Sequence, residues 1–500
     1  MTETAERAPA VRVEGGRLRG RMDRGVAAFL GIPYAAPPFG ARRMRPPEPP
    51  GRWVGEHPAT HYGPTCPQGI QGPQDAALFP QPVIPGEACL NLNVWTPDPG
   101  GSGLPVLVWV HGGMFLYGSG SAPGYRGTSF ARDGVVCVTI NYRLGAEGFC
   151  YLGDGTGNLG LLDQIAALEW VQANIAAFGG DPAKVTVAGQ SAGAMSITAL
   201  MAMPRAQGLF RHAVTQSGAA AQTLTAETAL RVGSTLAESL GVAPSREALS
   251  EVPVERVVRA ASAIFDEIQA NPDPARWGRL TPGVLPFAPV VDGDSLPVAP
   301  LDALAGGAAA GVHLLTGSNR EELRLVFVPP GTIDAVDEST LAAAAGAYGV
   351  PDGAVERYRA ARPEASSGDL LAAVMTDSFV RIPAIRVAET RVAAGEKDTW
   401  MCRFDHASTS FGGRLGAAHA VDLPYVFDLV DEESSRALAG DAPSQAVADT
   451  AHRAWVRFVA EGDPGWARYD LVDRSTALID EGLSVVDDPD SAERELWSRR

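Results

Sequence analysis

Short apolar runs alternate with longer amphipathic segments along most of the chain. The short runs lie at 106–110, 135–140, 185–188, 214–215, 314–316 and 400–404, and the first four of them are rich in β-branched residues. From Leu161 to Ala177, apolar residues recur at the spacing of a helix face. Strands that alternate with helices predict the α/β class, with a mostly parallel central sheet covered by helices on both faces.

Two later segments depart from this simple alternation. Residues 226–266 and 336–395 are rich in Ala, Leu, Glu and Arg, and we expect them to be helical insertions over the carboxyl edge of the sheet, where the functional groups of this fold class gather. No Pro/Ser-rich linker or charge run divides the chain, so we expect residues 1–500 to form one domain. Apolar residues make up 45% of the sequence, which is enough for a large core.

The net charge and the N-terminal residues limit which partners and which cell compartment we expect for this protein. The net charge of -17 weighs against nucleic acid and anionic membranes as partners. No apolar run reaches the length of a membrane span, and the first residues lack the basic start and apolar stretch of a secretory signal. We therefore expect a cytoplasmic protein that acts as a monomer. The five cysteines form no C-x-x-C pair, so we expect no zinc site.

One pentapeptide points to nucleophilic chemistry. Gly189-Gln190-Ser191-Ala192-Gly193 lies between the strand at 185–188 and a helical pattern at 192–201. Strand, sharp turn and helix in this order make G-x-S-x-G a nucleophile elbow. The turn presents the hydroxyl at the carboxyl end of the sheet, where the N-terminus of the next helix favours negative charge. Ser191 is therefore the predicted nucleophile.

A serine nucleophile needs a base, and the base needs an acid that orients it. In α/β-hydrolases the two follow the serine in the order acid, then histidine. Histidines follow Ser191 at positions 212, 313, 406, 419 and 452. His419 lies in a loop of small residues near the C-terminal end of the sheet, which favours it as the base. The residues alone leave Asp292, Glu321 and Glu322 open as the acid.

A second glycine-rich loop follows the strand that ends at Val110. Its glycines allow the N–H groups of Gly112 and Gly113 to approach a substrate oxygen, and the N–H of Ala192 is the predicted third donor of an oxyanion hole. We expect apolar residues beside this loop and before residue 289 to line the substrate pocket: Met114, Phe115, Leu116, Leu285 and Phe287.

Together these motifs resemble the type-B carboxylesterase family, the cholinesterase-like α/β-hydrolases, in its bacterial carboxylesterase branch. The resemblance covers nearly the whole chain and rests on the segments 29–35, 37–38, 89–95, 141–145, 160–164, 178–182, 189–193, 216–218, 289–293 and 419–427. It implies the α/β-hydrolase fold and hydrolysis of esters through an acyl-enzyme, with no metal or other cofactor. It also implies that Ser191 is the nucleophile, Glu322 the acid and His419 the base.

The resemblance implies further contacts and also shows departures. The implied contacts are a supporting hydrogen bond from Ser217 near the triad acid, ion pairs Arg43–Glu87 and Arg143–Asp163, and a disulfide between Cys66 and Cys89. The departures are Gln190 and Ala88 where the family often has Glu and Asp, and Leu323 and Met114 where it often has Gly. None of them removes a catalytic atom.

We predict a serine carboxylesterase that acts on neutral esters with short or medium acyl chains. Hydrolysis of amides, carbamates or lactones by the same triad stays open. A non-catalytic member that uses its surface for protein binding is the alternative from another class, but such members are expected to lack triad residues. Residues 67–88 contain no Trp to bind a quaternary ammonium, so we expect no cholinesterase activity.

Overall fold

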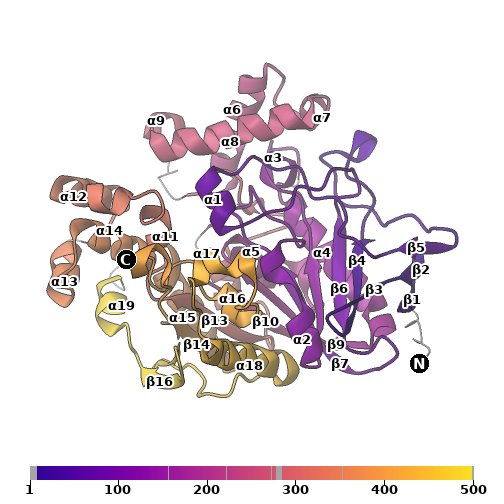
Figure 1. Ribbon diagram of the computed structural model, residues 1–500. Helices are drawn as coiled ribbons and strands as arrows, with labels where there is room; N and C mark the ends of the chain where they lie inside the picture. Colours follow the sequence, from indigo (N-terminus) through magenta and orange to yellow (C-terminus); the bar gives the residue numbers. More distant parts are fainter. Residues whose placement is uncertain are drawn as a thin grey trace.

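The computed structural model describes residues 8–155, 157–220, 222–271, 273–277, 284–351 and 353–497. An 11-stranded sheet runs through it in the order β16-β15-β14-β13-β10-β9-β7-β8-β6-β4-β3 (Figure 1). The strands from β8 to β15 in this order pair in parallel, and the edges are antiparallel. The predicted α/β class with a mostly parallel central sheet is confirmed.

The strands of the large sheet are β3 (Arg21–Asp23), β4 (Val26–Pro33), β6 (Asn91–Thr96), β7 (Leu104–Val110), β8 (Val136–Ile140), β9 (Gly180–Gln190), β10 (His212–Gln216), β13 (His313–Asn319), β14 (Thr399–Phe404), β15 (Ser475–Ile479) and β16 (Leu483–Asp487). Two small sheets hold β1 (Ala10–Val13), β2 (Gly16–Arg19) and β5 (Glu56–Pro58), and β11 (Leu224–Thr225) with β12 (Val290–Val291). All six predicted strands are present, but β9 starts at Gly180, before the predicted run. Its first five residues, at 180–184, form no apolar run, and among them Gly180 pairs with Leu104 of β7, so apolar patterning did not reveal this start.

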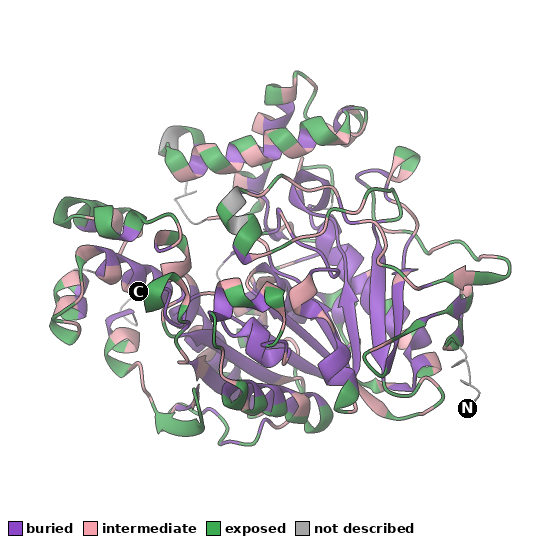
Figure 2. Cartoon of the chain, viewed as in Figure 1, coloured by how far each residue is buried: buried purple, intermediate pink, exposed green. Residues whose placement is uncertain are grey.

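The strands separate two cores, which explains why their sequences are continuously apolar. Val106, Val108 and Val110 of β7 belong to one hydrophobic cluster, whereas Leu107 and Trp109 belong to another. Alternate side chains of a strand point to opposite faces, so a sheet covered on both faces requires apolar residues at every position. Figure 2 shows the strands as buried and the outer helices as exposed on one side.

Helices that flank the sheet or connect its strands are α1 (Pro73–Leu78), α2 (Thr128–Arg132), α3 (Gly145–Phe149), α4 (Leu159–Asn174), α5 (Ala192–Ala202), α10 (Pro300–Ala305), α11 (Arg324–Phe327), α15 (Ile382–Ala393), α16 (Leu423–Val426), α17 (Arg436–Ala439), α18 (Gln445–Glu461) and α19 (Ser491–Trp497). The helix predicted at Leu161–Ala177 is α4, followed by a 3-10 turn at Ile175–Phe178. Among the described residues, no helix is both long and apolar enough to cross a membrane.

The two predicted insertions are helical. The first holds α6 (Ala226–Leu240), α7 (Arg246–Ser250) and α8 (Val254–Ala270), with α9 (Pro274–Trp277) beyond it. The second holds α12 (Glu338–Ala347), α13 (Ala354–Ala361) and α14 (Ser367–Thr376), and it runs into α15. Figure 1 places the first group at the top of the view and the second at the left. Their end signals are local: the Thr225 hydroxyl accepts from the Thr228 N–H at the start of α6, and Gly241 ends it with φ 73°.

Candidate active site

Ser191 occupies the turn between β9 and α5. Its backbone has φ 57° and ψ -127°, a conformation that residues other than glycine rarely adopt. The Ser191 N–H donates to the Gln216 carbonyl at 2.9 Å, and the Ser191 carbonyl accepts from the Met195 N–H at 3.0 Å. These two hydrogen bonds hold the strained turn between β10 and the first turn of α5.

Glycines on both sides of Ser191 allow the strand and helix to pack this closely. A Cβ at position 189 would lie 2.7 Å from the carbonyl carbon of Gly193, and a Cβ at position 193 would overlap the carbonyl oxygen of Val110. Real Cβ atoms do not make such contacts, so both positions require glycine. The elbow therefore depends on β7 as well as on the strand and helix that flank it.

The loop after β7 lies directly against the nucleophile. A Cβ at position 112 would lie 3.1 Å from the Cβ of Ser191. Residues 113–115 take successive positive φ values of 113°, 56° and 58°, which turn the chain sharply. The described residues provide no hydrogen-bond acceptor for the N–H groups of Gly112, Gly113 and Ala192. Gly112 lies against Ser191, Gly113 follows it in the same loop, and Ala192 begins α5, so these donors are suited to stabilise a negative oxygen.

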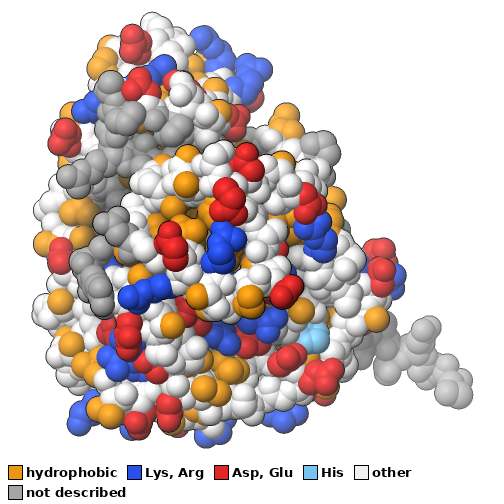
Figure 3. All heavy atoms as spheres, turned by 90° about the vertical axis from the view of Figure 1, so that its left-hand side faces the viewer, with side chains coloured by type: hydrophobic (Ala, Val, Ile, Leu, Met, Phe, Trp, Pro, Cys, Tyr) orange, Lys and Arg blue, Asp and Glu red, His pale blue; other side chains and the backbone are white. Residues whose placement is uncertain are grey.

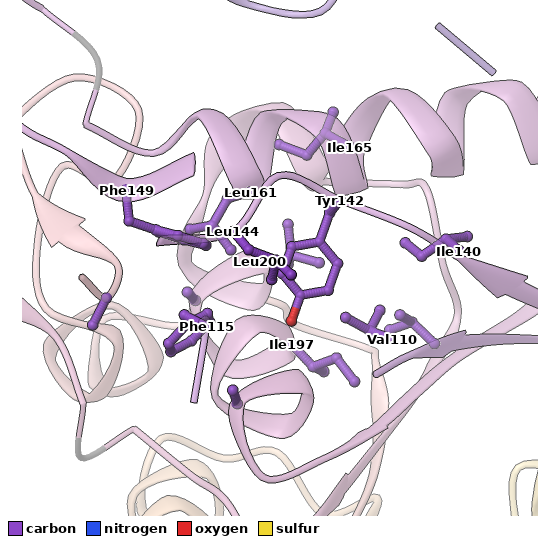
Figure 4. Close-up of a cluster of buried hydrophobic side chains, with 14 of the residues drawn as sticks. Val110, Phe115, Ile140, Tyr142, Leu144, Phe149, Leu161, Ile165, Ile197 and Leu200 are labelled. Carbon is purple, nitrogen blue, oxygen red and sulfur yellow. The ribbon is translucent and has the colours of Figure 1, made fainter. Parts of the chain in front are cut away.

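Phe115 of this loop belongs to a cluster of buried hydrophobic side chains, which also holds Tyr142 and Phe149 (Figure 4). The Tyr142 hydroxyl donates to the carbonyl of His111 at 2.8 Å, and the two rings stack with centroids 4.4 Å apart. Burial lowers the pKa of His111 to about 4, so this imidazole is neutral near pH 7. Phe115 packs on Phe149 at a centroid distance of 4.8 Å. The cluster therefore holds the loop without placing a second charged base in the site.

Glu322 and His419 meet from the loops after β13 and β14. The Nδ1 of His419 lies 2.7 Å from Oε2 of Glu322. Glu322 is fully buried, and its Oε1 accepts from the Asn319 N–H at 2.6 Å. The His419 N–H donates to the Glu322 carbonyl at 3.0 Å, which ties the two loops together. A buried carboxylate in this geometry fixes the Nδ1–H tautomer of the imidazole.

The other two acids that the sequence left open make different contacts. Glu321 pairs with Arg324 at 3.1 Å and accepts from the Ala417 N–H at 3.0 Å. Asp292 accepts from the Ser295 hydroxyl at 2.6 Å and from the Leu296 N–H at 3.0 Å, so it closes its own turn. Of the three, Glu322 is the one that contacts His419.

A further buried acid, Asp422, escaped the sequence analysis. It accepts from Nε2 of Gln216 at 2.6 Å and from Nδ2 of Asn319 at 3.1 Å. Burial raises the pKa of the Asp422 carboxyl, and the charge of Glu322 adds to this effect. The sequence feature that could have identified Asp422 is its place three positions after His419, on the short segment that leads into α16.

Gln190 contacts the base directly. Its Nε2 lies 2.9 Å from Nε2 of His419, and only 3% of the residue is exposed. Within the described residues, no hydrogen bond joins the Ser191 hydroxyl to His419. The sequence marks Gln190 only as a departure from a family that often has Glu, and nothing local indicates this contact.

The expected pocket residues differ in exposure. Met114 is 36% exposed beside the glycine loop, whereas Phe115 and Phe287 are fully buried. Leu116 and Leu285 are buried as well, with exposed fractions of 4% and 7%. Met114 is therefore the member of this set that presents substantial surface, and the lining role of the set stays a prediction.

Two further contacts that the resemblance implies have different outcomes. Arg143 pairs with Asp163 at 2.6 Å, as predicted. The predicted pair of Arg43 with Glu87 is wrong, because Arg43 pairs with Glu147 at 2.5 Å. Arg43 and Glu147 are both buried, whereas Glu87 is exposed, and a buried guanidinium needs a partner that is buried with it.

Ser217 and the cysteine pair also depend on the family resemblance. The Ser217 hydroxyl is buried and has no hydrogen-bond partner among the described residues, so its supporting role stays a prediction. Cys66 and Cys89 are free thiols in the structure, and the Cys66 Sγ lies 3.7 Å from the Cys89 carbonyl oxygen. The disulfide also stays a prediction.

The comparisons with known proteins agree with this arrangement. The Carboxylesterase family model matches residues 7–476. The chain belongs to the carboxylesterase family. It is 37% identical to the para-nitrobenzyl esterase of Bacillus subtilis (strain 168), over 97% of each chain. It is 34% identical to the phenmedipham hydrolase of Pseudarthrobacter oxydans, over 96% of this chain and 97% of that protein.

A solved structure matches over nearly the whole length. The carboxylesterase EST55 of Geobacillus stearothermophilus superposes with a TM-score of 0.85 at 37% identity, covering 98% of this chain and 99% of that chain. The chain is therefore a serine ester hydrolase of the bacterial carboxylesterase branch. Among the described residues, no group of three or more His, Cys, Asp and Glu is placed to hold a metal ion.

Proposed function

We propose that Ser191, His419 and Glu322 are the catalytic triad of this carboxylesterase. The Ser191 oxygen attacks the ester carbonyl while Nε2 of His419 takes the hydroxyl proton. Glu322 orients the imidazole and stabilises its charged form. His419 then gives the proton to the leaving alcohol, and water, activated in the same way, hydrolyses the acyl-enzyme and releases the acid.

The observation that carries this proposal is the 2.7 Å contact between Nδ1 of His419 and the fully buried carboxylate of Glu322. The strained conformation of Ser191 supports the nucleophile, because strain of this kind persists where the surrounding structure holds it. We assign the oxyanion hole to the N–H groups of Gly112, Gly113 and Ala192, whose place beside Ser191 supports this role.

Replacing the nucleophile tests the triad. We expect Ser191→Ala to lower kcat by about a million-fold, because removing a triad serine removes covalent catalysis. The variant should keep its thermal unfolding temperature and lose labelling by a fluorophosphonate serine probe. Ser484→Ala is the control, since it removes an exposed serine hydroxyl on β16, which has no role in the proposed site, and it should leave labelling intact. Ser191→Ala protein that still takes up the probe would refute the nucleophile assignment.

We further propose that the substrates are neutral esters with short or medium acyl chains. The exposed apolar side chain of Met114 beside the glycine loop supports contact with an apolar group. We expect kcat/KM for p-nitrophenyl butyrate to exceed that for p-nitrophenyl palmitate and for butyrylthiocholine. Amide, carbamate and lactone substrates in the same panel test the alternative hydrolase activities. A preference for any of these, or for palmitate, would contradict the proposal.

We also propose that residues 1–500 work as one domain, as a cytoplasmic monomer that binds neither nucleic acid nor membranes. The net charge of -17 supports the absence of polyanionic partners. Size-exclusion chromatography with light scattering should give a mass near 52.3 kDa. A mass of twice this value would contradict the monomer.

A further inference from the structure

Gln190 is placed between the base and the oxyanion loop. Its Nε2 lies 2.9 Å from Nε2 of His419, and its Oε1 lies 3.1 Å from where a Cβ at position 112 would stand. The residue is 3% exposed, at the end of β9, directly before the nucleophile. This amide therefore has little room to move, and it meets the nitrogen that must accept the serine proton.

The chemistry of the two groups determines which form of His419 this contact favours. An amide NH2 only donates, so Nε2 of the imidazole must accept, and it then carries no proton. Nδ1 carries the proton instead and donates it to Glu322 at 2.7 Å. The two contacts together select the neutral imidazole with its lone pair on Nε2. This is the form that a general base needs before the reaction.

The charged groups around His419 act in the opposite direction. Glu322 contacts its Nδ1, and Asp422 on the same segment interacts electrostatically with both His419 and Glu322. Negative charge beside an imidazole favours its protonated form. His111 on the oxyanion loop is neutral near pH 7, so it does not offset these carboxylates. Gln190 is the neighbour whose hydrogen bond favours the unprotonated base.

We infer that Gln190 is a positioning residue that keeps Nε2 of His419 unprotonated in the resting enzyme, and that it thereby sets the acidic limit of the working pH range. The inference rests on the proposed triad. On substrate binding, Nε2 exchanges the amide N–H of Gln190 for the hydroxyl of Ser191. One donor replaces another, so the exchange needs no change in protonation.

A glutamate at this position reverses the effect. The carboxylate of Gln190→Glu offers no N–H to the imidazole, and it accepts from a protonated Nε2. The variant should favour the protonated base, which cannot take the serine proton. The acidic limb of kcat/KM should then move up by about one pH unit, as for an opposite charge in direct contact. At a pH below both limbs, the rate should fall about tenfold.

The experiment compares the full-length wild type with Gln190→Glu and Gln190→Met. The readout is kcat/KM for p-nitrophenyl butyrate between pH 5 and 9, with the rate of fluorophosphonate labelling as a second profile. Methionine has a similar length but neither donates nor carries charge, so its limb should lie between the other two. The family often has Glu here, so the fold should accept this variant, and thermal unfolding checks that it does.

The outcomes separate the inference from the proposed function. The inference is supported if the pH of the acidic limb rises in the order wild type, Gln190→Met, Gln190→Glu. If a variant loses rate equally at every pH and its acidic limb stays at the wild-type pH, Gln190 has a merely structural role. This result overturns the inference, whether both variants show it or Gln190→Met alone. Wild-type protein that is neither labelled at Ser191 nor active on esters overturns the proposed function and the inference with it.

Discussion

Glu321 and Glu322 are adjacent and chemically identical, yet the fold gives them different surroundings. Glu322 is fully buried against the base, whereas the Glu321 side chain is partly exposed and pairs with Arg324. Neighbouring side chains in a loop point in different directions, so only one of them can reach His419. A shift of one position along the chain therefore separates the proposed triad acid from a carboxylate that only pairs with an arginine.

This difference gives a matched pair of variants. We expect Glu322→Gln to lower kcat by about 10⁴-fold, because an amide does not hold the imidazole in the required tautomer. Glu321→Gln should change kcat by no more than a few-fold, since its amide oxygen can still accept from the Ala417 N–H. Steady-state kinetics on p-nitrophenyl butyrate measures both. Equal and mild effects would indicate a different triad acid.

At the scale of elements, a buried ion pair joins the segment after β8 to α4. Arg143 donates through Nε to Asp163 at 2.7 Å and through Nη1 to the Arg45 carbonyl at 2.6 Å. Both side chains of the pair are almost fully buried. Removing one partner of such a pair leaves an uncompensated charge in the interior.

We therefore expect Asp163→Asn to lower the free energy of unfolding by about 3–5 kcal/mol. Chemical denaturation measures the change. Glu461→Gln removes a carboxylate from an exposed ion pair with Arg457 on α18 and is the control. It should change stability by at most about 0.5 kcal/mol. Similar effects of the two variants would contradict a structural role for the buried pair.

The predicted disulfide between Cys66 and Cys89, which lies just before β6, can be tested by oxidation. Both thiols of the pair are buried, and burial raises the pKa of Cys66. If they close a disulfide, the loop should add about 3 kcal/mol by chain entropy. We expect mass spectrometry of air-oxidised, unreduced protein to show the bond, with Cys137 of β8 still free as an internal control. Two free thiols at 66 and 89 after oxidation would count against it.

At the scale of the whole molecule, charge acts at long range. Acidic and basic side chains are interspersed on the face in Figure 3, but the chain as a whole carries a net charge of -17. A field of this sign slows the approach of anions and leaves neutral molecules unaffected. The net charge therefore favours neutral esters over anionic ones through the rate of encounter.

Ionic strength tests this effect. We expect kcat/KM for an ester with an anionic acyl group to rise by about two-fold between 0.01 and 0.15 M salt, as screening shortens the reach of the field. Hydrolysis of p-nitrophenyl butyrate should stay constant over the same range. An anionic ester whose rate falls with salt would show a local positive site that outweighs the net charge.

The sequence by itself determined the features that depend on near neighbours. Continuous apolar runs marked the strands, because a sheet covered on both faces buries every side chain. The glycines around Ser191 marked the elbow, because no other residue permits that approach of helix to strand. The family resemblance then assigned Glu322 as the acid, which the residues alone had left open.

Only the tertiary structure decided the contacts between distant segments. It paired Arg43 with Glu147 and extended β9 back to Gly180, which pairs with Leu104 of β7. It also brought Gln190 to His419, which lies 229 positions away in the chain. Spacing along a chain reports which residues share a strand or a helix face. Which side chains meet across loops depends on how the whole sheet orders its strands and buries its charges, and no local pattern contains that information.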